Sequence, residues 1–573
     1  MTASFAEKDW KASNAGVDHP GAVEAGGGGR WTLGLVAAAI AFCLLLQLHL
    51  VFVQPVNWDE FRFLADIHSY ARGELSGALL TFQVHFFGWL KGVGNEIEQI
   101  RAGRLVMLAL EAGTLAFIWT ISRRFFEPAT ALFAALGYVS FSFVLQHGAS
   151  FRFDPIVAFL VMGAVVLILR DRLSWLAMAG VGLALAIATM ISIKTALILP
   201  LVVAVAVWRL ADRERRRETF IRLLAAAITS VVFLGLLYAW HVSTLAGATS
   251  VEAQQGLAAS YSKTLGDMPF FPRRPYFLRS VTENPAHWLL LLLGIAAVGG
   301  GFRKTRARTL ALLAFLLPLL SVAFYRNAFP YFYGVILAPA AIFFSAAASR
   351  PELRKILGPV ALLLAAGGAL HHQQALSDSA KDQERTIEAV HAMFPKPVAY
   401  IDRCSMIATF PQVGMFLSTW WMENYVVAGK PVVRDMLVRK QPVFVIADSP
   451  FLFAALEGQP AAEMRGGFLE EDRRALQSNY VHHWGTVWVA GKIIEATPAG
   501  SEVEFLIGGP YSVESSQPVQ IDGRWISHGQ TLRIEPGKHR IAAARAQRVL
   551  FRWEAGLPRQ NANVPTELGF GRF

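Results

Sequence analysis

The sequence predicts a polytopic α-helical membrane protein that carries a soluble domain at its C-terminal end. Of its 573 residues, 54% are hydrophobic and only 17% are charged, whereas soluble domains carry about 25% charged residues. The apolar residues form runs long enough to cross a bilayer, which takes roughly 20 residues per helix. From residue 372 onward the apolar runs become short and alternate with polar turns.

The charge balance is basic, with 53 Lys and Arg against 42 Asp and Glu. The basic clusters stand in short loops between apolar runs, which is the arrangement that membrane topology requires. We therefore expect a lipid bilayer and no nucleic acid as partner. The two cysteines, Cys43 and Cys404, lie far apart in different kinds of segment, so we predict no disulfide and no cysteine metal site.

Residues 1–30 are polar and glycine-rich, as in "GAVEAGGGGR", and predict a disordered cytoplasmic leader. The apolar run at 31–53 is too long for the core of a signal peptide and lacks a small-residue cleavage site. We expect it to remain as the first membrane anchor.

The apolar runs predict about eleven spans. They lie near residues 31–53, 104–121, 129–147, 155–169, 175–192, 195–210, 221–242, 286–301, 307–325, 330–348 and 355–370.

The loop charges predict the orientation. With eleven spans, five basic loops fall on one side together with Arg30, which is the side that positive charge marks as cytoplasmic. The loops 54–103 and 243–285 then lie outside, as does everything after His371. This pattern is typical of a multi-pass protein of the bacterial inner membrane with a cytoplasmic N-terminus and a periplasmic C-terminal domain.

The C-terminal part, 372–573, changes character. Short apolar strands such as "PVFVIAD" end in polar turns and alternate with helix-like stretches up to about residue 483, which is an α/β pattern. From about 484 the residues alternate with period two between Gly and Pro turns and predict an antiparallel β module. The expected domains are thus a membrane catalytic domain, 31–371, and a periplasmic domain, 372–573.

Charged residues gather near the outer ends of the predicted spans. Charged groups this close to hydrocarbon are costly and are functional candidates. Cations that hold a phosphate and a carboxylate that removes a proton would suit such a site. Interfacial residues, a turn salt bridge and lysine snorkelling are the alternatives for single members. The set comprises Asp59, Glu60, Arg152, Asp154, Lys194 and Arg326.

Several of these residues belong to motifs that follow one another in a fixed order. The segment 102–170 contains most of them, and the pattern extends over about the first 350 residues. The segment resembles the membrane core of the glycosyltransferase-C superfamily, in particular protein O-mannosyltransferases and lipid A aminoarabinose transferases. The motifs are the acidic pair Asp59-Glu60, Arg104-Leu105, the basic-aromatic turn 123–126, Arg152-x-Asp154, and Lys194 before the apolar run that ends at Pro200.

The resemblance implies a membrane enzyme that passes a sugar from a polyprenyl-phosphate carrier to a lipid, glycan or protein acceptor on the outer face. Asp59 would deprotonate the acceptor hydroxyl with Glu60 beside it, and Asp154 would line the same cavity. Cationic partners of the carrier phosphate would be Arg152, Lys194 and Arg326. Direct displacement of the phosphate would invert the anomeric centre.

Three further residues are expected to bind phosphate on weaker grounds. His85, in "TFQVHFFGWL", stands where many relatives carry a basic residue or His before Pro-Pro, and it could equally lie on an interfacial helix. Arg273 and Arg274, in the outer loop 243–285, could meet the carrier phosphate or ordinary lipid headgroups. We expect no obligatory metal, although an acidic pair can recruit a divalent cation.

Two other classes stay open. A lipid-linked sugar transporter or flippase would move the same substrate without chemistry, but transporters usually place their charges near the bilayer midplane. A non-catalytic receptor would leave the outer carboxylates without a role. Within the enzymes, a glycan ligase or polymerase of the same superfamily is the alternative.

Overall fold

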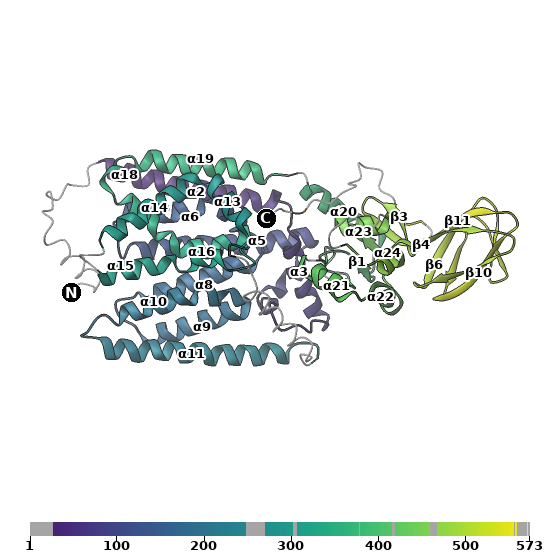
Figure 1. The fold of residues 1–573 in the computed structure, drawn as a ribbon, viewed down its shortest axis with the longest axis horizontal. Helices are drawn as coiled ribbons and strands as arrows, with labels where there is room; N and C mark the ends of the chain where they lie inside the picture. The colour runs from purple at the N-terminus through teal and green to yellow at the C-terminus, as the bar shows by residue number, and fades with distance from the viewer. Residues whose placement is uncertain are drawn as a thin grey trace.

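The computed structural model describes residues 27–247, 270–301, 306–377, 379–414, 417, 419–458, 467–554, 556–558 and 570. The helical bundle forms one end of an elongated molecule and the strands form the other (Figure 1). The predicted leader lies outside the described residues up to residue 26, and helix α2 begins at Gly27.

Helices occupy every apolar run that was predicted as a span. In chain order the bundle contains α2 (Gly27–Val53), α5 (Glu96–Ser122), α6 (Pro128–Val139), α7 (Ser142–His147), α8 (Phe153–Ile168), α9 (Trp175–Ile191), α10 (Leu199–Arg209), α11 (Arg216–Ser243), α14 (Pro285–Gly300), α15 (Arg306–Leu313), α16 (Tyr333–Ala340), α17 (Ile342–Ala348), α18 (Pro351–Lys355) and α19 (Leu357–Ala375).

By length and composition, three helices within the described residues could cross a membrane alone, namely α2 from Trp31, α5 and α11. Two bent pairs raise this number to five: α13 (Arg274–Glu283) with α14, bent by 93°, and Pro330–Ala340 with α17, bent by 54°. Other apolar helices are shorter, so eleven crossings stay a prediction. The apolar helices make the chain a membrane protein.

The C-terminal part begins with helix α20 (Ser379–Met393), and its first strands β1 (Tyr400–Ile401) and β2 (Phe444–Ile446) are parallel. The remaining helices are α21 (Thr419–Ala428), α22 (Val433–Lys440), α23 (Pro450–Leu456) and α24 (Glu470–Gln477). They alternate with the first strands, which is the α/β pattern that the sequence predicts.

A β sandwich follows, built of two sheets. One sheet has the order β1-β2-β4-β11-β6-β9, with β3 also paired to β4, and the other has the order β5-β10-β7-β8. Their strands are β3 (Tyr480–Trp484), β4 (Val487–Ala496), β5 (Ser501–Phe505), β6 (Gly509–Glu514), β7 (Val519–Ile521), β8 (Arg524–Ile526), β9 (Thr531–Ile534), β10 (Gly537–Ala543) and β11 (Gln547–Trp553).

Strand β4 joins the two predicted parts of this domain. Its first residues pair with β2 at Val487 to Val489, and its later residues pair with β11 from Gly491 to Ala496. The α/β part and the β module therefore share a continuous sheet. We call residues 379–558 the C-terminal lobe.

Polar contacts bind the lobe to the helical bundle. The carboxylate of Glu96, at the start of α5, accepts hydrogen bonds from the backbone N–H and the hydroxyl of Thr409, at 3.2 and 2.5 Å, and lies 3.0 Å from His391 Nε2. The side-chain amide of Gln383 pairs with both backbone groups of Val56, at 2.8 and 2.9 Å. The lobe is thus held directly over the turn that follows α2.

We expect the contact between α20 and α5 to weaken as the pH rises. Hydrogen bonding to Glu96 raises the pKa of His391 above its ordinary value of 6.5. A raised pKa means that the stabilisation is fully present below about pH 6.5 and is lost as the pH passes through the folded-state pKa. Hydrogen exchange of α20, compared between wild type and His391→Gln, should differ strongly near pH 5.5 and little near pH 9; equal differences at both would contradict this.

Candidate active site

The turn that follows α2 leads into the two adjacent carboxylates, Asp59 and Glu60. Helix α3 (Trp58–Ala71) begins with a capping box: the Asn57 side chain accepts a hydrogen bond from the Asp59 N–H at 3.0 Å, and Glu60 Oε2 accepts one from the Asn57 N–H at 3.0 Å. A capping box satisfies two helix N–H groups that otherwise have no partner. It also sends Asp59 and Glu60 in different directions.

Glu60 is bound inside the protein. Arg104 of α5 holds it bidentately, with Nε to Oε1 at 2.8 Å and Nη2 to Oε2 at 2.6 Å, and both side chains are almost fully buried. Glu60 Oε1 also accepts a hydrogen bond from the Phe151 N–H at 2.8 Å. The predicted catalytic partner of Asp59 therefore has both oxygens engaged.

Arg104 also completes the end of α2. Its guanidinium donates to the backbone carbonyls of Val51, Gln54 and Pro55 at 3.2, 2.8 and 3.2 Å. The last carbonyls of a helix need such partners because they have none within the helix. One buried arginine thus connects α2, α3 and α5.

The carboxylate of Asp59 is the first of four charged side chains that contact one another in series, and we call this series the chain of charges. Asp59 Oδ2 lies 2.6 Å from Arg152 Nη1, Arg152 Nε lies 3.6 Å from Asp154 Oδ2, and Asp154 Oδ1 lies 2.8 Å from Lys194 Nζ. Arg152 is the N-cap residue of α8, Asp154 stands in its first turn, and Lys194 lies in the short 3₁₀ helix η2 (Ile193–Leu197). The structure thus brings these four residues into one series of contacts.

The four side chains differ in exposure. Asp59 is 22% exposed and Lys194 is 15% exposed, whereas Arg152 and Asp154 are each 5% exposed. Asp59 and Lys194, which stand at the two ends of the chain of charges, are therefore its accessible members.

An aromatic ring lies against the two cations, Arg152 and Lys194. The Tyr331 ring, from the 3₁₀ helix η5 (Pro330–Phe332), is 3.6 Å from the Arg152 guanidinium carbon and 4.6 Å from Lys194 Nζ. Cation–π contacts of this kind gain strength when they are shielded from water. Tyr331 lies in the stretch "RNAFPYFYG", but no sequence pattern predicted this contact.

Arg326 and Arg273 form a neighbouring basic group. Arg273 Nε donates to the Arg326 carbonyl at 2.9 Å and its guanidinium lies 4.3 Å from the centre of the Phe329 ring. Phe329 stacks on Tyr331 at 5.7 Å. Arg326 pairs with Glu423 of the lobe at 2.9 Å. Arg274, at the start of α13, is exposed.

His85 does not belong to the chain of charges. It belongs to helix α4 (Val84–Phe87), which precedes the 3₁₀ helix η1 (Gly88–Gly92). Its Nε2 is 2.8 Å from His241 Nδ1, and its ring packs on Trp240 at 4.2 Å and on Tyr70 at 5.1 Å. These contacts include no member of the chain of charges, and they leave both sequence interpretations of His85 open.

The lobe contributes a residue that the sequence analysis missed. Arg403 lies with its guanidinium 4.0 Å above the ring of Trp58, the residue before Asp59. No local pattern marks Arg403, because it comes from the loop after β1 and reaches α3 only through the tertiary fold.

The described residues also contain one group of atoms with the chemistry of metal ligands. Asp402, Cys404 and Asp448 place ligand atoms within 4.8 Å of one another, all of them buried. Asp402 already accepts the Ser405 and Met406 N–H groups, and Asp448 accepts that of Arg403. Burial raises the pKa of Asp402 to about 6. These bonds give the two carboxylates a role in holding the loop of Arg403.

No family model matches this chain, and no curated protein matches it. Solved structures do. The oligosaccharyltransferase AglB from Archaeoglobus fulgidus, in complex with an inhibitory peptide and a dolichol-phosphate, superposes with a TM-score of 0.54 at 11% identity over 93% of this chain and 97% of that chain. The same enzyme tethered to an acceptor peptide with the NVT sequon gives 0.51 at 11% identity, over 93% and 98%.

ArnT from Cupriavidus metallidurans, bound to undecaprenyl phosphate, gives a TM-score of 0.49 at 13% identity over 75% of this chain and 95% of that chain. At these identities the likeness is one of fold. The two AglB superpositions confirm that the chain has the fold of the glycosyltransferase-C membrane enzymes, as the sequence resemblance predicted.

Removing one partner of the buried pair Glu60–Arg104 should destabilise the whole helical part. Breaking a buried ion pair leaves an uncompensated charge and costs about 3–5 kcal/mol. Thermal unfolding in detergent should show a large fall of the melting temperature for Glu60→Ala. Glu127→Ala is the matched control, because it breaks the exposed pair Arg354–Glu127 and should cost below about 1 kcal/mol. Equal effects of the two substitutions would contradict a structural role for Glu60.

Proposed function

We propose that this chain is a membrane glycosyltransferase that moves a sugar from a polyprenyl-phosphate donor to an acceptor hydroxyl at the outer face of the bacterial inner membrane. The supporting observation is the chain of charges Asp59–Arg152–Asp154–Lys194, which lies where the helical bundle meets the lobe. A buried set of two acids and two cations is costly to assemble and is therefore a candidate for function.

The cations suit the leaving group of this reaction. Transfer of the sugar leaves a negative charge on the carrier phosphate, and fixed cations in a shielded site stabilise such a charge strongly. Lys194 is partly exposed and Arg152 lies beside it across Asp154 and the Tyr331 ring. We assign both residues to the carrier phosphate, with Arg326 and Arg273 as the second basic group along its path.

Asp59 suits the role of base. It is the most exposed member of the chain of charges, so an acceptor can reach its carboxylate. In the free protein Arg152 pairs with Asp59 at 2.6 Å. An anionic donor phosphate competes for Arg152, and this competition would release Asp59 for proton transfer when the donor is bound. A hydroxyl deprotonated there attacks the anomeric carbon, the bond to the phosphate oxygen breaks, and the configuration inverts.

Glu60 has a different part in this proposal. Its two oxygens are held by Arg104 and by backbone N–H groups, so it positions Asp59 and does not itself exchange a proton. The same contacts separate the acidic pair, since Asp59 faces Arg152. We therefore assign no divalent cation to the pair.

The fold supports the donor class. AglB, which shares the fold, has been captured with a dolichol-phosphate and with acceptor peptides. A polyprenyl-phosphate donor and an acceptor bound at the outer face are proposed for this chain on that likeness together with the chain of charges. The nature of the sugar and the choice among lipid, glycan and protein acceptors are left to the assay.

Asp59→Asn should lower the rate of sugar transfer by about 10²–10⁴-fold, the usual contribution of a general base, while donor binding persists. Purified protein in liposomes with radiolabelled polyprenyl-phosphate sugars and candidate acceptors would measure it. Asp171→Asn is the control, since Asp171 pairs with Arg124 at the surface. Undiminished transfer by Asp59→Asn would refute the base, and movement of label between leaflets without transfer would favour a flippase.

Lys194→Ala should weaken binding of undecaprenyl phosphate by about tenfold or more, because it removes a cation from the proposed phosphate site. Lys355→Ala is the control, since Lys355 is exposed at the end of α18. Titration of the labelled lipid into protein in nanodiscs would measure the affinity. An affinity of Lys194→Ala equal to that of wild type would remove Lys194 from the phosphate site.

A further inference from the structure

The lobe contains a cavity of about 490 Å³. No member of the chain of charges lines it. It lies between the end of β1, the loop that follows it, and helices α22, α23 and α24. Its volume falls within the range of about 300–1,000 Å³ that is typical of small-molecule sites. No part of the proposed transfer reaction uses it.

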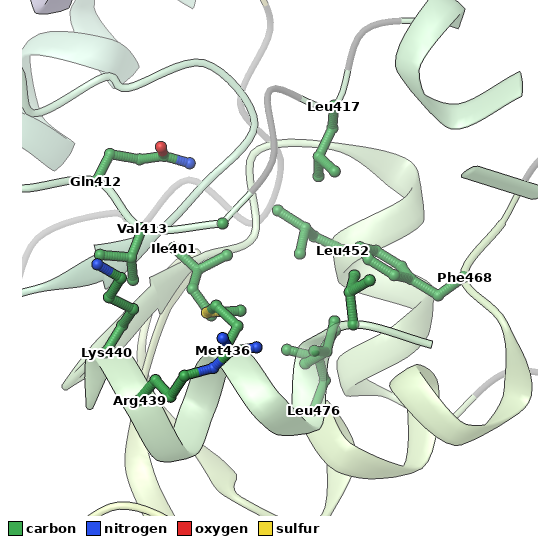
Figure 2. Close-up of a pocket in the computed structure, with 13 residues that line it drawn as sticks. Ile401, Gln412, Val413, Leu417, Met436, Arg439, Lys440, Leu452, Phe468 and Leu476 are labelled. Atoms are coloured by element: carbon green, nitrogen blue, oxygen red, sulfur yellow. The ribbon is translucent and has the colours of Figure 1, made fainter. Parts of the chain in front are cut away.

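Its inner wall is apolar. Ile401, Leu452, Phe468 and Leu476 each have 5% or less of their surface exposed, and in Figure 2 the last three lie on one side of the cavity. Walls of this kind offer no hydrogen bonds, so a polar ligand body would lose its bonds to water without replacement. The body of the ligand must be apolar.

Its rim is cationic. Arg439 and Lys440, the last two residues of α22, line the cavity together with Gln412, on the side opposite to Leu452 and Phe468 in Figure 2. Lys440 forms no ion pair within the part of the chain that the structure describes. Arg439 Nη2 lies 3.6 Å from Asp435 Oδ2, and both side chains are exposed. The cations therefore outnumber the acids at this rim.

Gly414 lines the cavity beside Met436. Gly414 adopts a φ of +108°, a conformation that other residues rarely adopt, and a Cβ there would lie 3.7 Å from Met436 Cε. The loop can therefore turn at the rim without a side chain entering the cavity. Met436 is unbranched and flexible, which allows it to adjust to an apolar guest.

We propose that this cavity binds an anionic amphiphile, with one apolar chain against the inner wall and a carboxylate or phosphate head at Arg439 and Lys440. Charge complementarity at the rim and the apolar wall together select this class over a neutral lipid or a sugar. The site lies in the lobe that is hydrogen-bonded to the turn after α2. The proposal does not depend on the transferase reaction.

The test uses the full chain in nanodiscs with dansylaminoundecanoate, a fluorescent carboxylate amphiphile, as the probe and empty nanodiscs as the blank. We expect saturable fluorescence beyond the blank. Dodecanoate or dodecyl phosphate should displace the probe at least about tenfold better than dodecanol, because one charge-assisted contact is worth about a factor of ten. The better of the two anions identifies the head group as carboxylate or phosphate.

Two substitutions address the two parts of the site. Met436→Trp should fill the cavity and abolish the saturable signal, and Lys440→Glu, at an exposed position that should not affect folding, should weaken it about tenfold or more. Lys396→Glu is the matched control, because Lys396 is an exposed lysine of the same lobe away from the cavity. Asp59→Asn should bind the probe like wild type, which separates this site from the transfer reaction.

Absence of a signal above empty nanodiscs would overturn the proposal, as would equal probe binding by Met436→Trp and wild type. Displacement by dodecanol as strong as by the two anions, or full binding by Lys440→Glu, would overturn the anionic head group. Displacement by an apolar peptide and not by dodecanoate would mean that the cavity docks a protein segment instead.

Discussion

The buried ion pair between Glu60 and Arg104 is the constraint on which the position of the chain of charges depends. A pair withdrawn from water at 2.6 Å repays its desolvation only when the remaining donors and acceptors are also satisfied. Here they are, through three carbonyls at the end of α2 and two backbone N–H groups. This arrangement holds the end of α2, the start of α3 and the turn before α8 in one position, and Asp59 and Arg152 stand on that frame.

Close packing of the turn supports the same frame. A Cβ on Gly103, one residue before Arg104, would meet the Phe151 ring at 2.5 Å, so only glycine allows the turn to approach α5 this closely. Phe151 is also the residue whose N–H is bound to Glu60. The position of Arg152 thus follows from one ion pair and one close backbone approach.

The lobe contacts the residues around the chain of charges. Glu423 holds Arg326, Arg403 covers Trp58, and Gln383 is bound to Val56. Of these contacts the Gln383–Val56 hydrogen bonds are buried, and a buried polar contact between two domains helps to fix their relative position because an unpaired group would be costly.

The sequence by itself determined the membrane class, the helical runs and the α/β character of the C-terminal part, because hydropathy and periodicity are local properties. It also predicted that Asp59, Arg152, Asp154 and Lys194 lie together, because loop charge would place all four at the same ends of the predicted spans, and the structure brings these four side chains into contact. Only the tertiary structure decided that Glu60 turns inward to Arg104, that Tyr331 lies against both cations, and that Arg403 covers Trp58. Those contacts join segments distant in the chain, and side-chain direction at such contacts is decided by packing, which no local pattern records.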